Sequence, residues 1–393
     1  ELIEILADMV FTSRFSTEDM EVERKVILEE LLGTEESASD VFGRALSKGI
    51  WPHHPYGLPV GGHPEEVEAL DFERIRDFWR RWYRPSRMTL SIAGPVDSEE
   101  VRHVATREFN RQLDPVDRPR PSGVIHTQIE PVVIHSPFKE RFIELVFPGP
   151  ALLDDAVPVL DVLATVLGAS ESSPLMEALQ HKRSLAVACW ASLSPRRDGG
   201  ALYVGCQPIK GREKEALQCL WDVLEKVRST GFSGEEVART KALLAGERLL
   251  SSQTVEAKAL DALWHQMTAD EPEQGDRYLA QVAAVSISQI QRMAEEVLNP
   301  SKASTVVMMP EGEFAPADFV AQGARAQEVS SKSRSIRREL AGGTTLLMES
   351  GGPGSLCAIR VLGLGGRLLE TPASAGRSRL WASSVVCGAG GLN

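Results

Sequence analysis

Two acidic residues near the start of the chain have a spacing that could serve a metal site. Glu23 and Glu30 lie in the stretch EVERKVILEE, which runs from residue 21 to residue 30. In a helix, seven residues fall only about 20° short of two turns, so both carboxylates lie on one face. Such a pair could offer one metal ligand and one residue that supports it. An acidic helix is more often a solvated surface, so spacing alone leaves both interpretations open.

Three histidines gather further along the chain. His53, His54 and His63 lie in the stretch WPHHPYGLPVGGHP, from residue 51 to residue 64. Imidazoles are common metal ligands, so a metal cluster is conceivable. The prolines and glycines among them are typical of turns. We therefore favour a turn-rich structural loop.

Composition narrows the classes of protein that this chain can belong to. The 393 residues contain 55 acidic and 43 basic side chains, giving a formal net charge of -12. That balance argues against a nucleic-acid partner. No run of about 18 apolar residues occurs, so no membrane span is predicted. We expect a soluble protein, cytoplasmic or periplasmic if bacterial, with the compartment otherwise open.

The cysteines carry no pattern that indicates a site. The chain has five of them, an odd number, and none forms a CxxC pair. A disulfide framework or a cysteine-based zinc site is therefore not expected, and buried free thiols are. They are Cys189, Cys206, Cys219, Cys357 and Cys387.

The sequence repeats itself. Residues 71–95 match residues 286–310 at a constant offset without a gap, and both end in strand-like residues and proline. An earlier match, at a slightly larger offset, places Glu30 on Glu247. A weaker match relates residues 358–370 to residues 142–154. A fixed period indicates repeated structural units.

The repeat suggests four segments. Residues 1–115 are the later part of a first unit, and residues 127–312 are a complete second unit. Residues 313–332 form a linker, and residues 333–393 begin a third, degenerate unit. Both ends of the chain look like cuts through a larger protein, with roughly 90 residues of the first unit expected before Glu1.

Each unit is predicted to have an α+β fold, with an antiparallel sheet and helices packed on one face. Helical spacing predicts helices over Leu152–Leu167 and Arg212–Thr230. Short β-type runs predict strands. These are Met88–Ala93, Arg141–Phe147, Ala186–Leu193 and Ala201–Ile209.

The order of these motifs resembles a known family. The pattern ER-x-V-I-x-x-E, then HPYGLPVGGHPEEVEAL and WYRPSRMTLSIAGPVDSEEV, is similar to the insulinase/pitrilysin zinc metallopeptidases over residues 1–110. It resembles in particular the branch that contains the mitochondrial processing peptidase and its bacterial relatives. Residues 172–193 resemble that family's second unit, which typically reads S-S-R-L and then R-E-K-x-G-L-A-Y. Here Gln180 stands at the arginine position and Val187 at the tyrosine position.

The resemblance implies a Zn²⁺ site. In the family, an inverted HxxEH motif supplies two histidine ligands and the glutamate that activates water. A later glutamate is the third ligand; carried over, it is Glu30, and Glu23 matches a supporting acidic residue. In the second unit, Thr240 replaces the counterpart of Glu23, while Glu247 persists.

No HxxEH motif occurs in these 393 residues. Its place in the first unit falls before Glu1. In the third unit, Arg379, Ala382 and Ser383 stand where the motif would have its histidines and glutamate. That unit is therefore expected to be inactive.

Two functions fit this sequence. The first is a piece of a zinc-dependent endopeptidase that cleaves peptides or unfolded segments with metal-activated water, the piece itself being inactive. The second is a non-catalytic peptidase-like subunit that binds a substrate or a partner. Either function implies a peptide or protein substrate and other units of the same fold as partners. An extended peptide could add to a sheet edge.

Overall fold

The computed structural model describes residues 1–52, 54–110, 132–313, 325–328, 335–339 and 345–349. The chain divides into two compact units, Glu1–Ser333 and Arg334–Asn393. In the second of these units, β7 (Ser335–Glu339) pairs antiparallel with β8 (Thr345–Glu349). The rest of the predicted third unit, including Arg379, Ala382 and Ser383, lies outside the described residues.

The part of the chain before residue 110 forms helices. Polar residues begin several of them, because an unpaired amide at a helix start needs an acceptor. Ser16, Ser37, Asp71 and Asp97 each accept a hydrogen bond from a backbone amide at the start of the helix that follows. The helices are α1 (Leu2–Phe11), α2 (Thr17–Glu35), α3 (Ala38–Ile50), α4 (Pro64–Glu68), α5 (Phe72–Trp82) and α6 (Ser98–Phe109).

A six-stranded sheet forms the centre of the following region. Its order is β3-β4-β2-β5-β1-β6. The pairs β3–β4, β4–β2 and β2–β5 are antiparallel, whereas β1 pairs in parallel with both β5 and β6. The strands are β1 (Val132–Ser136), β2 (Phe142–Gly149), β3 (Ala186–Ser194), β4 (Gly200–Pro208), β5 (Ser304–Pro310) and β6 (Arg325–Glu328).

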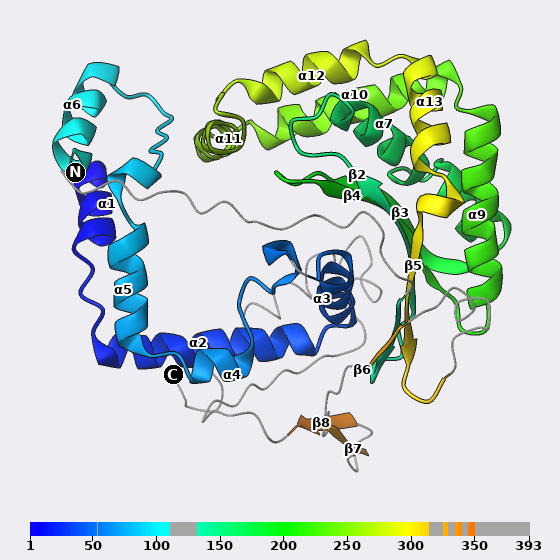
Figure 1. The fold of residues 1–393 in the computed structure, drawn as a ribbon, viewed down its shortest axis with the longest axis horizontal. Coiled ribbons are helices and arrows are strands. Elements are labelled where there is room, and N and C mark those ends of the chain that lie inside the picture. The colour runs from blue at the N-terminus through cyan, green and yellow to red at the C-terminus, as the bar shows by residue number, and fades with distance from the viewer. Residues whose placement is uncertain (53, 111–131, 314–324, 329–334, 340–344, 350–393) are drawn as a thin grey trace, which may run out of the picture. The chain divides into compact units, whose positions relative to one another are not determined.

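Helices cover one face of this sheet and enclose the larger core (Figure 1). The helix α7 is apolar nearly all round because it is buried between the sheet and other helices. It begins at Val157, later than predicted, since turns occupy the residues before it. The helices are α7 (Val157–Gly168), α8 (Pro174–Met176), η3 (Glu177–Lys182), α9 (Glu213–Thr230), α10 (Gly234–Ser251), α11 (Val255–Ala269), α12 (Gln274–Ala284) and α13 (Ile287–Val297).

The opposite face of the sheet is covered by α3, which comes from the first part of the chain. Val41 and Phe42 of α3 share a second core cluster with Ile134 of β1 and Val146 of β2. The ring of Phe42 stacks on that of Phe142, with centroids 5.0 Å apart. The predicted α+β fold is therefore confirmed, with one added helix on the second face and a sheet that is mixed.

The repeat is visible in the helix boundaries. The offset that relates residue 71 to residue 286 also relates α5 to α13 at both ends, and it relates two short 3-10 helices, η2 (Pro85–Arg87) and η4 (Pro300–Lys302). The slightly larger offset that places Glu30 on Glu247 relates the start of α2 to that of α10, and the start of α3 to that of α11. The helices of the two copies begin and end at equivalent residues because the same helix caps and turns recur at a fixed spacing in the sequence.

One predicted strand is wrong. Met88–Ala93 is not part of a sheet, although its counterpart β5 is. The strand β5 lies between β1 and β2. Among the described residues, no strand pairs with Met88–Ala93. A β-type run becomes a strand only where another strand can pair with it.

The described part of the chain also bears on two sequence expectations. Cys189, Cys206 and Cys219 are buried free thiols, as predicted, and the remaining two cysteines lie outside the described residues. No helix within the described ranges has the length and apolar character needed to span a membrane.

Candidate functional site

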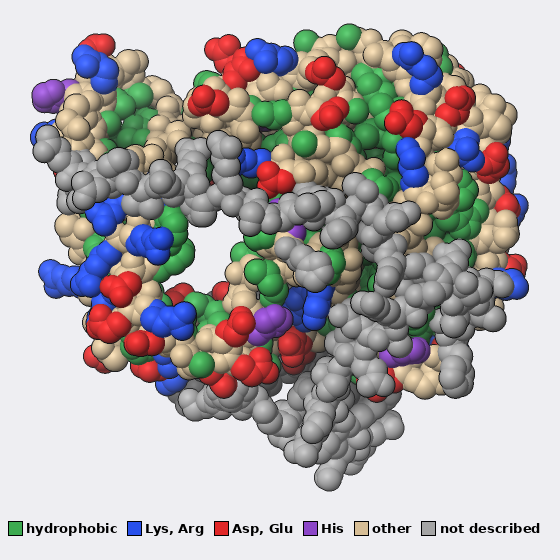
Figure 2. All heavy atoms as spheres, in the orientation of Figure 1, with side chains coloured by type: hydrophobic (Ala, Val, Ile, Leu, Met, Phe, Trp, Pro, Cys, Tyr) green, Lys and Arg blue, Asp and Glu red, His purple; other side chains and the backbone are tan. Residues whose placement is uncertain are grey.

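The two predicted site residues lie on one continuous helix. Glu23 and Glu30 are both exposed on α2, which is unbroken between them. Among the described residues, neither carboxylate accepts a hydrogen bond or joins an ion pair. Acidic and basic side chains are mixed on the surface over α2 (Figure 2). The shared helix face is thus present, and both carboxylates are free to accept a ligand.

Arg24, which lies beside Glu23, fixes this part of α2. Its guanidinium donates to the backbone carbonyl of Leu70 at 2.6 Å and lies 4.4 Å from the ring centroid of Phe72. These two contacts join α2 to the start of α5. Sequence analysis gave Arg24 no role, although an arginine beside the apolar positions of a helix often covers them with its stem.

The described residues do not make a zinc site by themselves. They contain no group of three histidine, cysteine, aspartate or glutamate side chains placed to hold a metal ion. Glu30 alone does not fit Zn²⁺, which needs three protein ligands in catalytic sites. On α10, Thr240 is buried and Glu247 is exposed, so this helix offers no better set of metal ligands than α2 does.

The histidine loop has structural contacts. His54 is buried, its Nδ1 accepts from the backbone amide of Tyr56 at 3.2 Å, and the two rings lie 4.1 Å apart. His63 begins α4 in a reciprocal cap with Glu66. His53 lies outside the described residues. These contacts support the turn-rich structural interpretation of the loop.

Residues 180–187, where the sequence departs from the family pattern, run from η3 into β3 and are held by a side-chain contact. The π-helix η3 contains Gln180, whose side-chain amide donates to the backbone carbonyl of Val187 on β3. Between them Ser184 has a φ of 48°, in the left-handed region. The family pattern has glycine at this position, and glycine adopts that conformation without steric cost.

Neighbouring segments contact β3, an edge strand of the sheet, at three places. Gln180 contacts Val187, and Gly168 of α7 lies so close that a Cβ there would be 2.3 Å from the amide nitrogen of Ala191. Just past the strand, Leu152 donates to the carbonyl of Arg196 at 2.8 Å.

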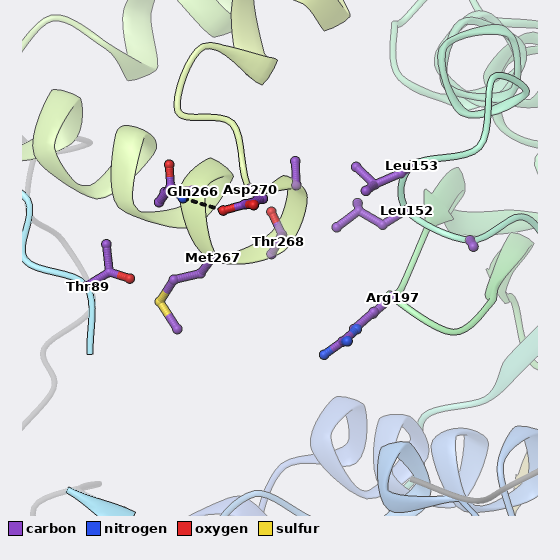
Figure 3. A pocket seen from close by; sticks show the side chains of 10 residues that line it. Thr89, Leu152, Leu153, Arg197, Gln266, Met267, Thr268 and Asp270 are labelled. Carbon is purple, nitrogen blue, oxygen red and sulfur yellow. Dashed lines mark hydrogen bonds between the residues drawn. The ribbon is translucent and has the colours of Figure 1, made fainter. Parts of the chain in front are cut away.

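A pocket of about 570 Å³ lies nearby, within the unit Glu1–Ser333. Leu152, Leu153 and Arg197 point into it from one side, and Met267 lies across from them at the end of α11 (Figure 3). Arg197 is exposed and has no acidic partner among the described residues. The pocket is lined by Thr89, Ala151, Leu152, Leu153, Arg197, Gln266, Met267, Thr268, Ala269 and Asp270. No sequence motif indicates this pocket, because its residues come from distant segments.

A family model described as the inactive domain of M16 peptidases matches residues 69–244. The match covers α5, most of the central sheet and the Gln180–Val187 region. Over that range the chain resembles the M16 peptidase family. The resemblance to the insulinase/pitrilysin peptidases is thereby confirmed.

Two relatives are named as zinc proteases, and two solved structures share the fold. A protein of Streptomyces coelicolor named an uncharacterized zinc protease is 27% identical over 314 residues, covering 78% of this chain and 68% of that protein. One of Mycobacterium leprae with the same description is 26% identical over 309 residues, covering 78% and 69%. The structure of a Helicobacter pylori protease has a TM-score of 0.71 and 20% identity, covering 79% of this chain and 76% of that one. A Pseudomonas fluorescens M16 inactive domain has a TM-score of 0.67 and 15% identity, covering 80% and 76%. The two structures support the fold alone.

Proposed function

We propose that this chain is the non-catalytic, peptide-holding part of a zinc-dependent endopeptidase that acts on peptides or unfolded segments. The observation that carries the proposal is the match of residues 69–244 to an inactive peptidase domain. Leu152, Leu153 and Arg197, which form one side of the pocket, all lie within that range. The relatives named zinc proteases support an enzyme of that class.

The pocket is suited to a short stretch of peptide. Its volume lies within the usual range for ligand sites, about 300–1,000 Å³. Leu153 and Met267, which are 55% and 60% exposed, offer apolar contact from opposite sides. Arg197 adds a cation that can form a charge-assisted pair with a carboxylate. The arrangement favours a peptide with an acidic residue beside apolar ones.

The zinc centre needs residues beyond this chain. In the complete enzyme, Glu30 would be the third zinc ligand and Glu23 its supporting residue, with two histidines from an HxxEH helix. Zinc bound in that way supplies a water of lowered pKa. This chain's own part is to hold Glu30 on α2, through the contacts of Arg24 with Leu70 and Phe72. The four predicted segments, with boundaries at 1–115, 127–312, 313–332 and 333–393, belong to the same proposal.

The second candidate is a subunit that binds a partner or substrate and takes no part in cleavage. The departures at Gln180 and Val187 favour it, because they remove a cation and a phenol that the family pattern has. An intact HxxEH helix in the complete protein would support the enzyme, and a degenerate one would support the subunit.

Peptide binding can be measured by fluorescence anisotropy on the full chain. We expect a labelled short peptide with one glutamate between leucines to bind. Arg197→Gln should weaken it about five- to tenfold, the loss of one charge-assisted contact. A matched peptide with glutamine in place of glutamate should be insensitive to that change. Met267→Ser should weaken both peptides, and Arg239→Gln, an exposed arginine on α10, should weaken neither. Absence of binding by the wild-type chain would overturn the proposal.

A further inference from the structure

Glu144 is a carboxylic acid buried on the face of the sheet against which α3 packs. It lies in the middle of β2 and is 2% exposed. Its neighbours on the same face, Phe142 and Val146, belong to the core cluster that α3 covers. Successive residues of a strand point to opposite faces, so Glu144 lies on the face against which α3 packs, away from the larger core.

The carboxyl group has one partner among the described residues. The indole N–H of Trp190 lies 3.0 Å from each of its two oxygens. Across the strand pair, Gly205 leaves the room that the side chain occupies, since a Cβ there would lie 2.7 Å from Glu144 Oε2. Burial raises the pKa of Glu144 to about 8, and the hydrogen bond from Trp190 lowers it only in part.

No cation among the described residues neutralises this acid. From the turn that precedes β4, Arg196 lies over the ring of Trp51, 4.8 Å from its centroid. On α3, Arg44 donates to Thr34 of α2, and Asp40 and Lys48 are exposed.

Two titratable groups of β4 lie near Glu144. Burial raises the pKa of Tyr203 to about 12, and it raises that of Cys206, on the other face of the sheet, well above its usual value. Both groups are therefore neutral at the pH at which Glu144 ionises, and neither can compensate its charge.

We propose that α3 is a pH-dependent latch, which is seated on the sheet while Glu144 is protonated and is released when Glu144 ionises. A buried carboxylate without a cation costs several kcal/mol. Release of α3 admits water to the carboxylate and removes that cost. The larger core on the other face of the sheet contains no residue of α3, so it stays intact.

The direction of the pH effect follows from the raised pKa. In the released state Glu144 ionises near its ordinary value of 4.5. The stability of the seated state is therefore complete below that pH and is lost as pH rises through about 8. Only Glu36 and Ser37 separate α2 from α3, so release also loosens the end of the helix that carries Glu30.

Hydrogen exchange of the full chain, read by mass spectrometry and corrected for intrinsic rates, tests the latch. From about pH 6 to about pH 8, protection of residues 38–51 in the wild type should fall by up to tenfold per pH unit. Protection of α9, which packs on the other face of the sheet, should stay constant over that range. In Glu144→Gln, whose amide cannot ionise, protection of residues 38–51 should not change with pH.

Asp161→Asn is the matched control, because Asp161 is on α7, on the other face of the sheet, and burial raises its pKa to about 6. This variant should keep the wild-type fall in α3 protection. A fall of the same size in Glu144→Gln would overturn the latch, and so would a wild type in which α3 protection is independent of pH. The wild-type comparison of α3 with α9 decides the matter even if Glu144→Gln does not fold.

Discussion

The side-chain amide of Gln180 donates a hydrogen bond to the backbone carbonyl of Val187, at the start of the next strand. These are the two positions at which the M16 pattern has arginine and tyrosine. The contact ties the π-helix η3 to the start of β3, and the side chain of Val187 is 65% exposed beside it. This chain therefore retains the local fold of that motif while lacking its cation and its phenol.

Replacing Ser184, which lies between those two residues, with glycine should stabilise the fold. Its φ of 48° is unfavourable for a side chain with a Cβ. We expect Ser184→Gly to raise the free energy of unfolding by about 1 kcal/mol, measured by urea denaturation. Ser252→Gly is the control, since Ser252 has a φ of -106° and gains nothing from added freedom. Equal responses of the two variants would remove the strain explanation.

Arg141 holds a buried ion pair that the sequence did not indicate. It is 6% exposed, and its Nε lies 2.9 Å from Oε1 of Glu213, which is 8% exposed. Arg141→Met leaves the Glu213 carboxylate buried without its cation, which should cost about 3–5 kcal/mol in the free energy of unfolding. The double variant Arg141→Met with Glu213→Leu should regain most of that loss, because the buried carboxylate is gone and Glu313, the second partner of Arg141, keeps its ion pair with Lys210 at 3.3 Å.

A surface pair provides the comparison for Arg141. Arg212 and Glu215 lie 2.7 Å apart and are largely exposed. Arg212→Met should therefore change stability far less than Arg141→Met, because water screens that pair. If the two single variants lose similar stability, the buried pair has no special role.

The assignment of Glu30 is tested in the complete enzyme. Glu30→Gln replaces a negative ligand with a neutral and poorer one, so both zinc content and peptide cleavage should fall. Glu23→Gln should affect zinc content less, with losses of about 10- to 100-fold at most in affinity or activity. Glu247→Gln, at the equivalent place on α10, should leave both unchanged. Wild-type zinc content in Glu30→Gln would show that α2 is a solvated surface.

The spacing of apolar residues, together with helix caps and prolines, predicted much of this fold. The helix limits around Asp71 and Ser286 follow from caps and prolines that are local in sequence, and the repeat made them visible twice. Met88–Ala93 was predicted wrongly because a strand depends on a partner, and no local pattern contains that information. The packing of α3 on the sheet was not predicted either, because it depends on a contact between Phe42 and Phe142, which are far apart in the chain.

The candidate site was predictable only where a motif carried it. Glu23 and Glu30 followed from the family pattern, and their placement on one helix face followed from spacing. The pocket at Leu152, Arg197 and Met267 brings together loops and a helix end whose residues form no motif. The buried Glu144 lies in an apolar strand, where one acidic residue among apolar neighbours was the sole signal.

Zinc content of the purified 393-residue chain tests the central claim most directly. The account assigns one zinc ligand, Glu30, to this chain and the histidine ligands to residues outside it. After dialysis against metal-free buffer, elemental mass spectrometry should therefore find far less than one zinc ion per chain. One zinc ion per chain that resists a chelator would contradict the account, because these residues would then form a complete metal site of their own.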